Sequence, residues 1–211
     1  AGTYYFTNPD RQAMIRESAE GFFKTEAPVA AFRKLRDAQD ATGFDRALWA
    51  KMAQMGFAGV LVPESHGGSG FGYVGAGLIQ EAIGRNLSLT PMLSTAILSV
   101  TALLAGGTDA QKSAYLPKIA NGEWLMALAC DEKARHTPNH VATRAESAGN
   151  GFKLNGRKAF VLDGHVADRL IVVARTSGAD ADTAGITLFL VDPAASGVSI
   201  ERQSMVDCRN A

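Results

Sequence analysis

The sequence predicts an α+β multidomain protein, with an N-terminal all-α helical domain followed by an antiparallel β-barrel or β-sandwich domain. Two observations support this prediction. Apolar residues recur at helical spacing up to about residue 120, and from Glu123 onward they occur in short runs separated by Gly, Asn and Asp. The β region also stops at Ala211 without an evident closing strand. We therefore expect a helical domain at residues 1–122 and an incomplete β domain at residues 123–211.

Capping residues and apolar faces define the expected helices. Pro9 suits the first turn of a helix. Asp45 can cap the helix that follows it, and either Thr108 or Asp109 can cap the helix at 109–120. Gly56 is a helix stop. The apolar faces of the first two helices carry Ile15, Ala19, Phe22, Phe23 and then Leu48, Trp49, Met52, Met55. Further helices are expected at about 73–86, 92–105 and 109–120.

Residues 86–108 contain no charge and would extend about 35 Å as a helix, enough to cross a bilayer. Pro91 interrupts this run, however, and six Ser and Thr residues between positions 88 and 101 dilute it. We therefore predict a buried helix within the helical domain and no membrane span.

Six short segments predict the strands of the β domain. Each is rich in apolar or β-branched residues, and Asn-Gly pairs at 150–151 and 155–156 predict hairpin turns between them. The segments are 124–130, 141–147, 151–156, 158–162, 169–176 and 185–191.

Composition is typical of a soluble globular protein. Of the 211 residues, 46% are hydrophobic and 20% are charged, and 21 Lys and Arg balance 21 Asp and Glu, which argues against a nucleic-acid partner. Cys130 and Cys208 are too few for a disulfide framework, and residues 1–12 lack the pattern of a signal peptide. We expect a cytoplasmic protein.

The glycine motif GFGYVG at 70–75 has the spacing of a dinucleotide fingerprint but lacks its context. The segment ESHGGS separates the glycines from the preceding apolar run, and residues 90–100 contain no acid to bind a ribose. We interpret the motif as a flexible Gly-rich loop before a helix, and His66 beside it as a solvated loop histidine.

A second stretch, LACDEKARHTPNH at 128–140, gathers five ligand-type side chains. It has neither a C-x-x-C nor an H-E-x-x-H pattern, and Pro138 argues against a helix that would align its two histidines. The sequence also has no G-x-S-x-G nucleophile motif. The residues alone leave a polar loop, a metal site or an altered binding site open, with the metal site the weakest of the three. The five are Cys130, Asp131, Glu132, His136 and His140.

Three segments resemble the acyl-CoA dehydrogenase family, in the order in which that family has them. PESHGGSGFGYVGAGLIQEAIGR (63–85) resembles its P-E-x-x-G-G-x-G loop and E-x-x-x-R helix, and GGTDAQKSAYLPKIANGE (106–123) its G-T-x-x-Q-K segment. TRAESAGNGFKLNGRKAFV (143–161) resembles its L-N-G-x-K stretch. Within the family, the chain looks most like the small subunits of two-component acyl-CoA dehydrogenases, such as pimeloyl-CoA dehydrogenase.

The resemblance implies an FAD enzyme that oxidises an acyl-CoA thioester to the 2,3-enoyl-CoA, with a carboxylate base and hydride transfer to the flavin. The base of the family lies in a C-terminal helical bundle beyond Ala211, so no catalytic residue is assigned here. The implied partners are an acyl-CoA substrate, a related subunit in a homo- or hetero-oligomer, and electron-transfer flavoprotein as acceptor. The alternatives are a non-catalytic partner subunit that has lost its own flavin site, and a flavin monooxygenase on the same fold.

The same resemblance interprets residues 130–137 as a rewritten flavin loop. Cys130 stands where the family has a flavin-binding threonine, Arg135 where it has a glycine and His136 where it has a serine. Arg135 would either hinder the close approach that a glycine permits or pair with a phosphate. Leu162 ends the second flavin strand, 160–162, and cannot donate the usual hydrogen bond. The implied FAD-binding residues are Ala127, Ala129, Cys130, Arg135, His136, Phe160, Val161 and Leu162.

Overall fold

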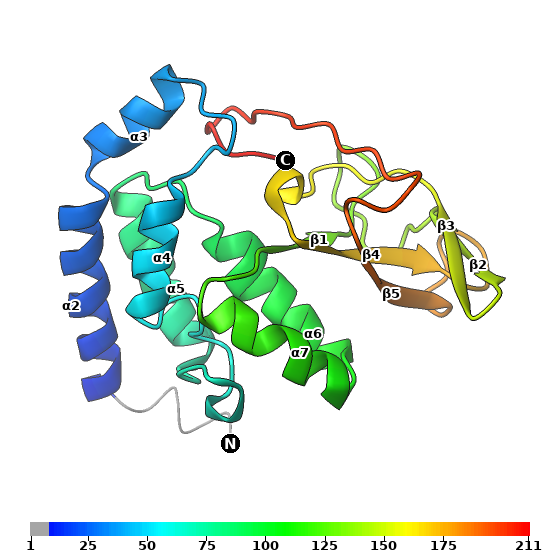
Figure 1. The fold of residues 1–211 in the computed structure, drawn as a ribbon, viewed down its shortest axis with the longest axis horizontal. Coiled ribbons are helices and arrows are strands. Elements are labelled where there is room, and N and C mark those ends of the chain that lie inside the picture. The colour runs from blue at the N-terminus through cyan, green and yellow to red at the C-terminus, as the bar shows by residue number, and fades with distance from the viewer. Residues whose placement is uncertain (1–8) are drawn as a thin grey trace. The chain divides into compact units, whose positions relative to one another are not determined.

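A computed structural model describes residues 9–211, which form two compact units (Figure 1). The first unit ends at Leu125 and is helical, and the second runs from Met126 to Ala211 and contains the strands. The predicted order of a helical domain followed by a β domain is confirmed. Residues 1–8 lie outside the described part of the chain. They make up most of the segment 1–12, for which we expected no signal peptide.

The helices of the first unit begin and end close to the residues that the sequence predicts. The Asp45 carboxylate accepts a hydrogen bond from the Ala47 N–H at 2.8 Å, and Thr108 and Gln111 form a reciprocal capping box. The short helix α3 was not predicted. The helices are α2 (Pro9–Glu26), α3 (Val29–Asp37), α4 (Arg46–Gln54), α5 (Gly72–Arg85), α6 (Val100–Gly106) and α7 (Asp109–Ala120).

The uncharged run at 86–108 forms two helical segments. A π-helix, η2 (Met92–Ser99), leads into α6; most residues of η2 are buried, whereas α6 buries only Val100 and Leu103. Ser94, Thr95 and Ser99 are buried there among apolar residues. Across residues 9–211, no helix is both long and apolar enough to cross a membrane.

The predicted apolar faces of α2 and α4 form much of the core of the first unit. Phe23 is fully buried and lies against Phe22 and Phe57, with ring centroids 5.1 and 6.1 Å away. Met52 is also fully buried, whereas Met55 is 47% exposed and does not belong to the core. Met55 is the C-cap residue of α4, where the helix turns away from its own apolar face.

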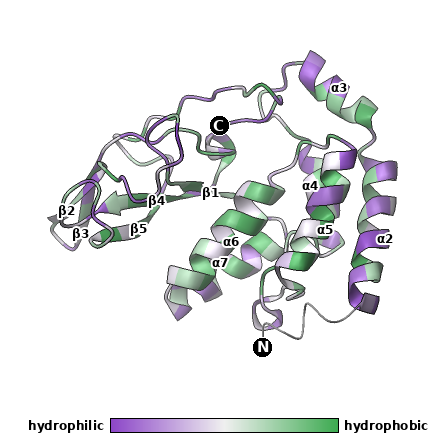
Figure 2. Cartoon of the chain, turned by 180° about the vertical axis from the view of Figure 1, so that it is seen from behind, coloured by the Kyte–Doolittle hydropathy of each residue, from purple (hydrophilic) through white to green (hydrophobic). Residues whose placement is uncertain are grey.

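In the second unit, strand β4 (Arg169–Arg175) is the centre of a five-stranded sheet (Figure 1). Strand β5 (Ile186–Val191) runs antiparallel along one edge of β4. Strand β1 (Met126–Ala129) pairs in parallel with the first half of the other edge, and β2 (Arg144–Ala148) meets that edge at Arg175. Strand β3 (Gly151–Asn155) pairs with β2 in an antiparallel hairpin. Strands β1, β4 and β5 are mainly hydrophobic, whereas β2 is mainly hydrophilic (Figure 2).

This sheet corrects the predicted all-antiparallel barrel or sandwich, because β1 is parallel to β4 and the described strands form one mixed sheet. The Gly149-Asn150 turn joins β2 and β3 as predicted, with Gly149 at φ +58°. The Asn155-Gly156 pair does not form a hairpin. A Cβ at Gly156 would lie 2.4 Å from the Thr143 hydroxyl, so this glycine permits a close approach between two segments.

The predicted strand at 158–162 is also wrong. These residues pair with no strand of the sheet, and Phe160 has a positive φ of +53° that is incompatible with a regular ladder. The Gly164 N–H donates to the Val161 carbonyl at 3.0 Å, which closes a turn instead. The proposed second flavin segment is therefore a bent chain and not a strand.

Candidate functional site

Two segments that lie far apart in the sequence meet in the second unit. One is the loop that leaves β1 at Cys130, and the other is the segment that leaves β3 after Asn155. The Ala159 N–H donates to the Asp131 carbonyl at 2.7 Å, and the Lys158 ammonium donates to the Cys130 carbonyl at 3.1 Å. The structure thus brings together the two regions in which the flavin-binding residues were predicted.

Glu132 and Lys158 form a buried ion pair at this junction. Lys158 Nζ lies 2.7 Å from Glu132 Oε1, and each side chain is only 8% exposed. The same carboxylate accepts hydrogen bonds from the Ala142 N–H at 2.8 Å, the Thr143 N–H at 2.9 Å and the Thr143 hydroxyl at 2.6 Å. The Glu132 carboxylate therefore joins the start of the segment 130–143 to its end.

The pKa of Glu132 reflects these contacts. Burial on its own raises the pKa of the carboxyl group, but the hydrogen bonds from Lys158, Thr143 and Ala142 outweigh it and lower the pKa from 4.5 to about 2. Burial, and after it the neighbouring charge of Asp131, raise the pKa of the Cys130 thiol. The raised pKa favours the neutral thiol of Cys130, which is a weak hydrogen-bond donor.

The exposed stretch of the loop carries the charged groups that the sequence singled out. His136 Nδ1 lies 2.9 and 3.1 Å from the two carboxylate oxygens of Asp131, and the imidazole is 70% exposed. Arg135 is exposed as well, and its carbonyl accepts a hydrogen bond from the Thr137 hydroxyl at 3.4 Å. These side chains reach solvent and are accessible to an anion.

The remaining predicted residues divide between core and surface. Ala127 belongs to a buried cluster with Ala167 and Leu170, against which Val161 packs, so the side chains of Ala127 and Val161 are structural. Ala129 is buried in β1, and Leu162 is half-buried. Phe160 is 48% exposed and lies next to Ala159, the residue that bonds to the loop.

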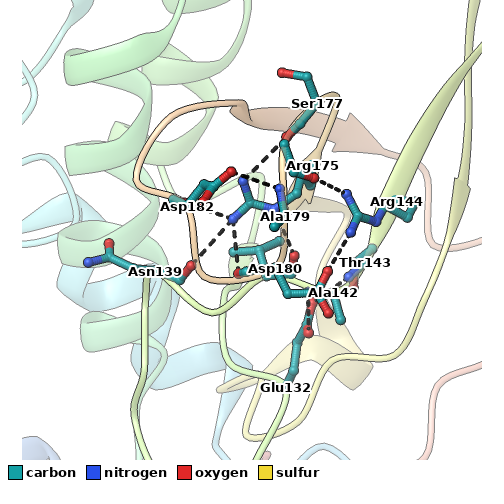
Figure 3. Close-up of polar contacts among 12 residues, drawn as sticks. Glu132, Asn139, Ala142, Thr143, Arg144, Arg175, Ser177, Ala179, Asp180 and Asp182 are labelled. Carbon is teal, nitrogen blue, oxygen red and sulfur yellow. Dashed lines mark hydrogen bonds and ion pairs between the residues drawn. The ribbon is translucent and has the colours of Figure 1, made fainter.

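Sequence analysis missed the residue that holds the far end of the loop, Arg175. This arginine is 1% exposed and donates to six backbone carbonyls and to no carboxylate (Figure 3). Two of those carbonyls, of Asn139 and Val141, belong to the loop, at 3.4 and 3.0 Å. The other four lie between β4 and β5 and belong to Ser177, Asp180, Asp182 and Ala184.

Little in the sequence marked these buried charges. Lys158 stands in the quoted L-N-G-x-K stretch, which was the only signal for it, and Glu132 was considered only as one of five ligand-type residues. Arg175 ends the apolar run of β4, where a charge is typical of the end of a strand. In the described chain, no three His, Cys, Asp or Glu side chains group as metal ligands would.

The Gly-rich loop does not have the geometry of a phosphate cradle. No strand precedes it within residues 57–69, and the N–H groups of Gly68, Ser69, Gly70 and Phe71 all donate to carbonyls of residues 59–63. A Cβ at Gly68 would lie 2.0 Å from the Val62 carbonyl oxygen. These glycines serve a tight turn before α5, in agreement with the interpretation as a loop.

Two family models match this chain in succession. Residues 9–123 match the acyl-CoA dehydrogenase N-terminal domain, and residues 127–208 match the acyl-CoA dehydrogenase middle domain. The chain belongs to the acyl-CoA dehydrogenase family. Members of this family are FAD-dependent oxidoreductases that act on CH–CH bonds, so the family resemblance in the sequence is confirmed.

Individual relatives agree with this assignment. The chain is 35% identical over 162 residues to mitochondrial isovaleryl-CoA dehydrogenase of Pongo abelii, covering 75% of the chain and 38% of that protein. It is 34% identical over 213 residues to 3-(aryl)acrylate reductase of Clostridium sporogenes, covering 97% and 54%. The crystal structure of the ChsE4-ChsE5 complex from Mycobacterium tuberculosis matches with a TM-score of 0.82 and 25% identity, over 97% of the chain and 53% of that structure's chain. The chain spans about half the length of the proteins it matches.

The side chains at the meeting point of the two segments fit parts of a flavin dinucleotide. Arg135 is an exposed guanidinium suited to a phosphate, and Phe160 offers an exposed aromatic face to a ring system. Leu162 and the Cys130 thiol offer little hydrogen bonding, so the polar attraction at this junction comes from exposed cations such as Arg135 and from the backbone.

Proposed function

We propose that this chain is part of a subunit of an FAD-dependent acyl-CoA dehydrogenase that oxidises an acyl-CoA thioester to the 2,3-enoyl-CoA. The observation that carries the proposal is the junction of the loop 130–137 with the segment 158–162, within the two family domains matched in the right order. The thioester is that of a fatty, dicarboxylic or steroid-side-chain acid.

FAD, when bound, supplies the redox chemistry by accepting the hydride from the substrate. The chain's own residues bind and orient it. Arg135 and His136 would hold its phosphates, and Asp131 keeps the His136 ring in place through the contacts at 2.9 and 3.1 Å. Phe160 would lie beside the ring system, and the backbone of Ala127, Ala129 and Cys130 would line the site.

The proposed partners follow from the same family. The related ChsE4-ChsE5 assembly is a complex of two chains, which supports a hetero-oligomer with a second, related subunit. Electron-transfer flavoprotein is the proposed electron acceptor, and the cytoplasm the proposed location. We propose no base for the α-proton among the described residues of this chain.

A second candidate is a non-catalytic partner subunit that stabilises an active relative and binds no flavin of its own. Two observations favour it. Cys130 carries a raised pKa and a weak donor where the family has a threonine, and Leu162 has no donor at all. Each lost neutral hydrogen bond weakens flavin binding by roughly 0.5–1.5 kcal/mol, which is too little to abolish it by itself.

Anaerobic reduction by substrate separates these functions. The protein, at its full natural length and together with its related subunit, is mixed with acyl-CoA thioesters of graded length and an artificial electron acceptor. Reduction of the acceptor supports the dehydrogenase. A complex that turns over equally well when this chain carries no flavin supports the partner role. In a separate aerobic assay, oxygen consumption with NADH supports a flavin monooxygenase.

A further inference from the structure

The two segments of the proposed flavin site have no sheet ladder to hold them together. The loop 130–137 leaves the sheet after β1, and residues 156–163 pair with no strand. Among the described contacts, three polar interactions bridge them: Ala159 N–H to the Asp131 carbonyl, and Lys158 to both the Cys130 carbonyl and Glu132. Two of the three depend on one side chain, Lys158.

Glu132 extends this connection to a third segment. Its Oε1 receives Lys158 Nζ and both donors of Thr143, and its Oε2 receives the Ala142 N–H. Figure 3 shows Glu132 directed at the chain of residues 142 and 143 from below. Because the pair is buried and every charge has partners, loss of one member leaves the other charge uncompensated and frees the segments that it joins.

The loop is also held at its far end. Arg175 binds the carbonyls of Asn139 and Val141, so the backbone is fixed at residue 132 and again at residues 139–143. Only residues 133–138 between these two anchors are uniformly exposed. A stretch with both ends fixed presents Arg135 and His136 in a limited range of positions, which lowers the entropy cost of binding a ligand there.

We propose that Glu132 and Lys158 are positioning residues of the flavin site: their buried pair fixes the loop 130–137 against the segment 158–162, so that the cofactor meets a preformed site. This inference rests on the proposed function and assigns neither residue a contact with the flavin. Lys158 is occupied by Glu132 and by the Cys130 carbonyl, so it is not assigned to the phosphates.

The test compares Lys158→Met with Lys153→Met in the full-length protein with its related subunit. Lys153 is an exposed lysine of β3 in the same sheet and serves as the matched control. Both apoproteins are titrated with FAD, and the visible circular dichroism of the bound flavin is recorded at saturation. We expect Lys158→Met to weaken FAD binding by at least about tenfold and to change the dichroism at saturation, with Lys153→Met unchanged. Lys158→Arg should recover part of the native spectrum.

Wild-type affinity for FAD and a wild-type flavin spectrum in Lys158→Met would overturn the proposal. An ion pair that only stabilises the fold would lower the melting temperature of the variant but leave the spectrum of its bound flavin unchanged. A second arm needs no cofactor. Amide hydrogen exchange in Glu132→Gln should show lost protection at Ala142, Thr143 and Ala159, and unchanged protection at all three contradicts the proposal even where Lys158→Met does not fold. A wild-type complex that binds no flavin would refute the proposed function instead, while the exchange arm would still decide whether the pair joins the segments.

Discussion

Glu132 links the protonation of one residue to the stability of the β unit. Its pKa of about 2 in the folded chain lies below the ordinary value of 4.5, so the folded chain binds this proton less tightly than the unfolded chain. The stability that Glu132 contributes is therefore complete above pH 4.5 and is lost as the pH falls toward about 2.

The corresponding variant is Glu132→Gln, with Glu146→Gln on the exposed face of β2 as control. Between about pH 5 and pH 2, the gap in unfolding free energy between wild type and Glu132→Gln should close by on the order of 3 kcal/mol. Urea unfolding at a series of pH values measures this. Glu146→Gln should follow the wild type, and a gap for Glu132→Gln that does not change with pH would contradict the assignment.

Arg175 makes a second prediction at the residue scale. Its planar guanidinium directs five donors at six carbonyls, and a lysine ammonium at the same position has three donors at a single point. Arg175→Lys should therefore cost about 3 kcal/mol or more of unfolding free energy, because at least three buried carbonyls lose a charged donor and each such hydrogen bond is worth about 1.5–3 kcal/mol. Arg144→Lys, at a half-exposed guanidinium paired with Asp180, should cost less than about 1 kcal/mol. If both variants lost the same unfolding free energy in chemical denaturation, the buried Arg175 would contribute no more than the surface pair of Arg144 and Asp180.

At the scale of elements, α7 is specified by local signals and its stability is testable locally. Thr108 and Gln111 exchange hydrogen bonds at 3.2 and 2.9 Å. Thr108→Ala should lower the stability of the helical unit by about 1 kcal/mol, whereas Ser113→Ala, at an exposed interior position of α7, should leave it unchanged or raise it slightly. Thermal unfolding measures both, and an unaffected Thr108→Ala protein would mean that the capping box is not formed in solution.

The elements that the sequence predicted are those whose signals are local. The caps at Asp45 and Thr108 and the Gly149-Asn150 turn involve residues within four positions of one another, so the local sequence reveals them. The parallel pairing of β1 with β4 joins residues more than forty positions apart, and no short-range pattern specifies it. The segment 158–162 has the composition of a strand, but Lys158 and Ala159 donate hydrogen bonds to the loop after β1. This tertiary contact overrides the local preference for a β-strand.

The candidate site shows the same division. The residue types of the loop 130–137 and the aromatic Phe160 were visible in the sequence through the family resemblance, and the structure brings the two segments together. The buried charges that hold them, Glu132, Lys158 and Arg175, were not recognised as such, because burial of a charged side chain is a property of the folded chain.

On the scale of the whole molecule, the chain contributes two domains of a family whose members are about twice as long. The proposed cofactor loop 130–137, the segment 158–162 and the ion pair that joins these two segments lie in its β unit. We propose that this unit still holds FAD, although the family resemblance implies that Cys130 and Leu162 stand where relatives have hydrogen-bonding residues.

The visible absorption spectrum of the full-length protein, purified alone and then together with its related subunit, tests this claim most directly. We expect flavin absorption bands, with FAD released on denaturation, either in the protein alone or, on addition of the partner, in excess of the flavin that the partner binds by itself. A protein that remains colourless in both preparations, and after incubation with excess FAD, would contradict it.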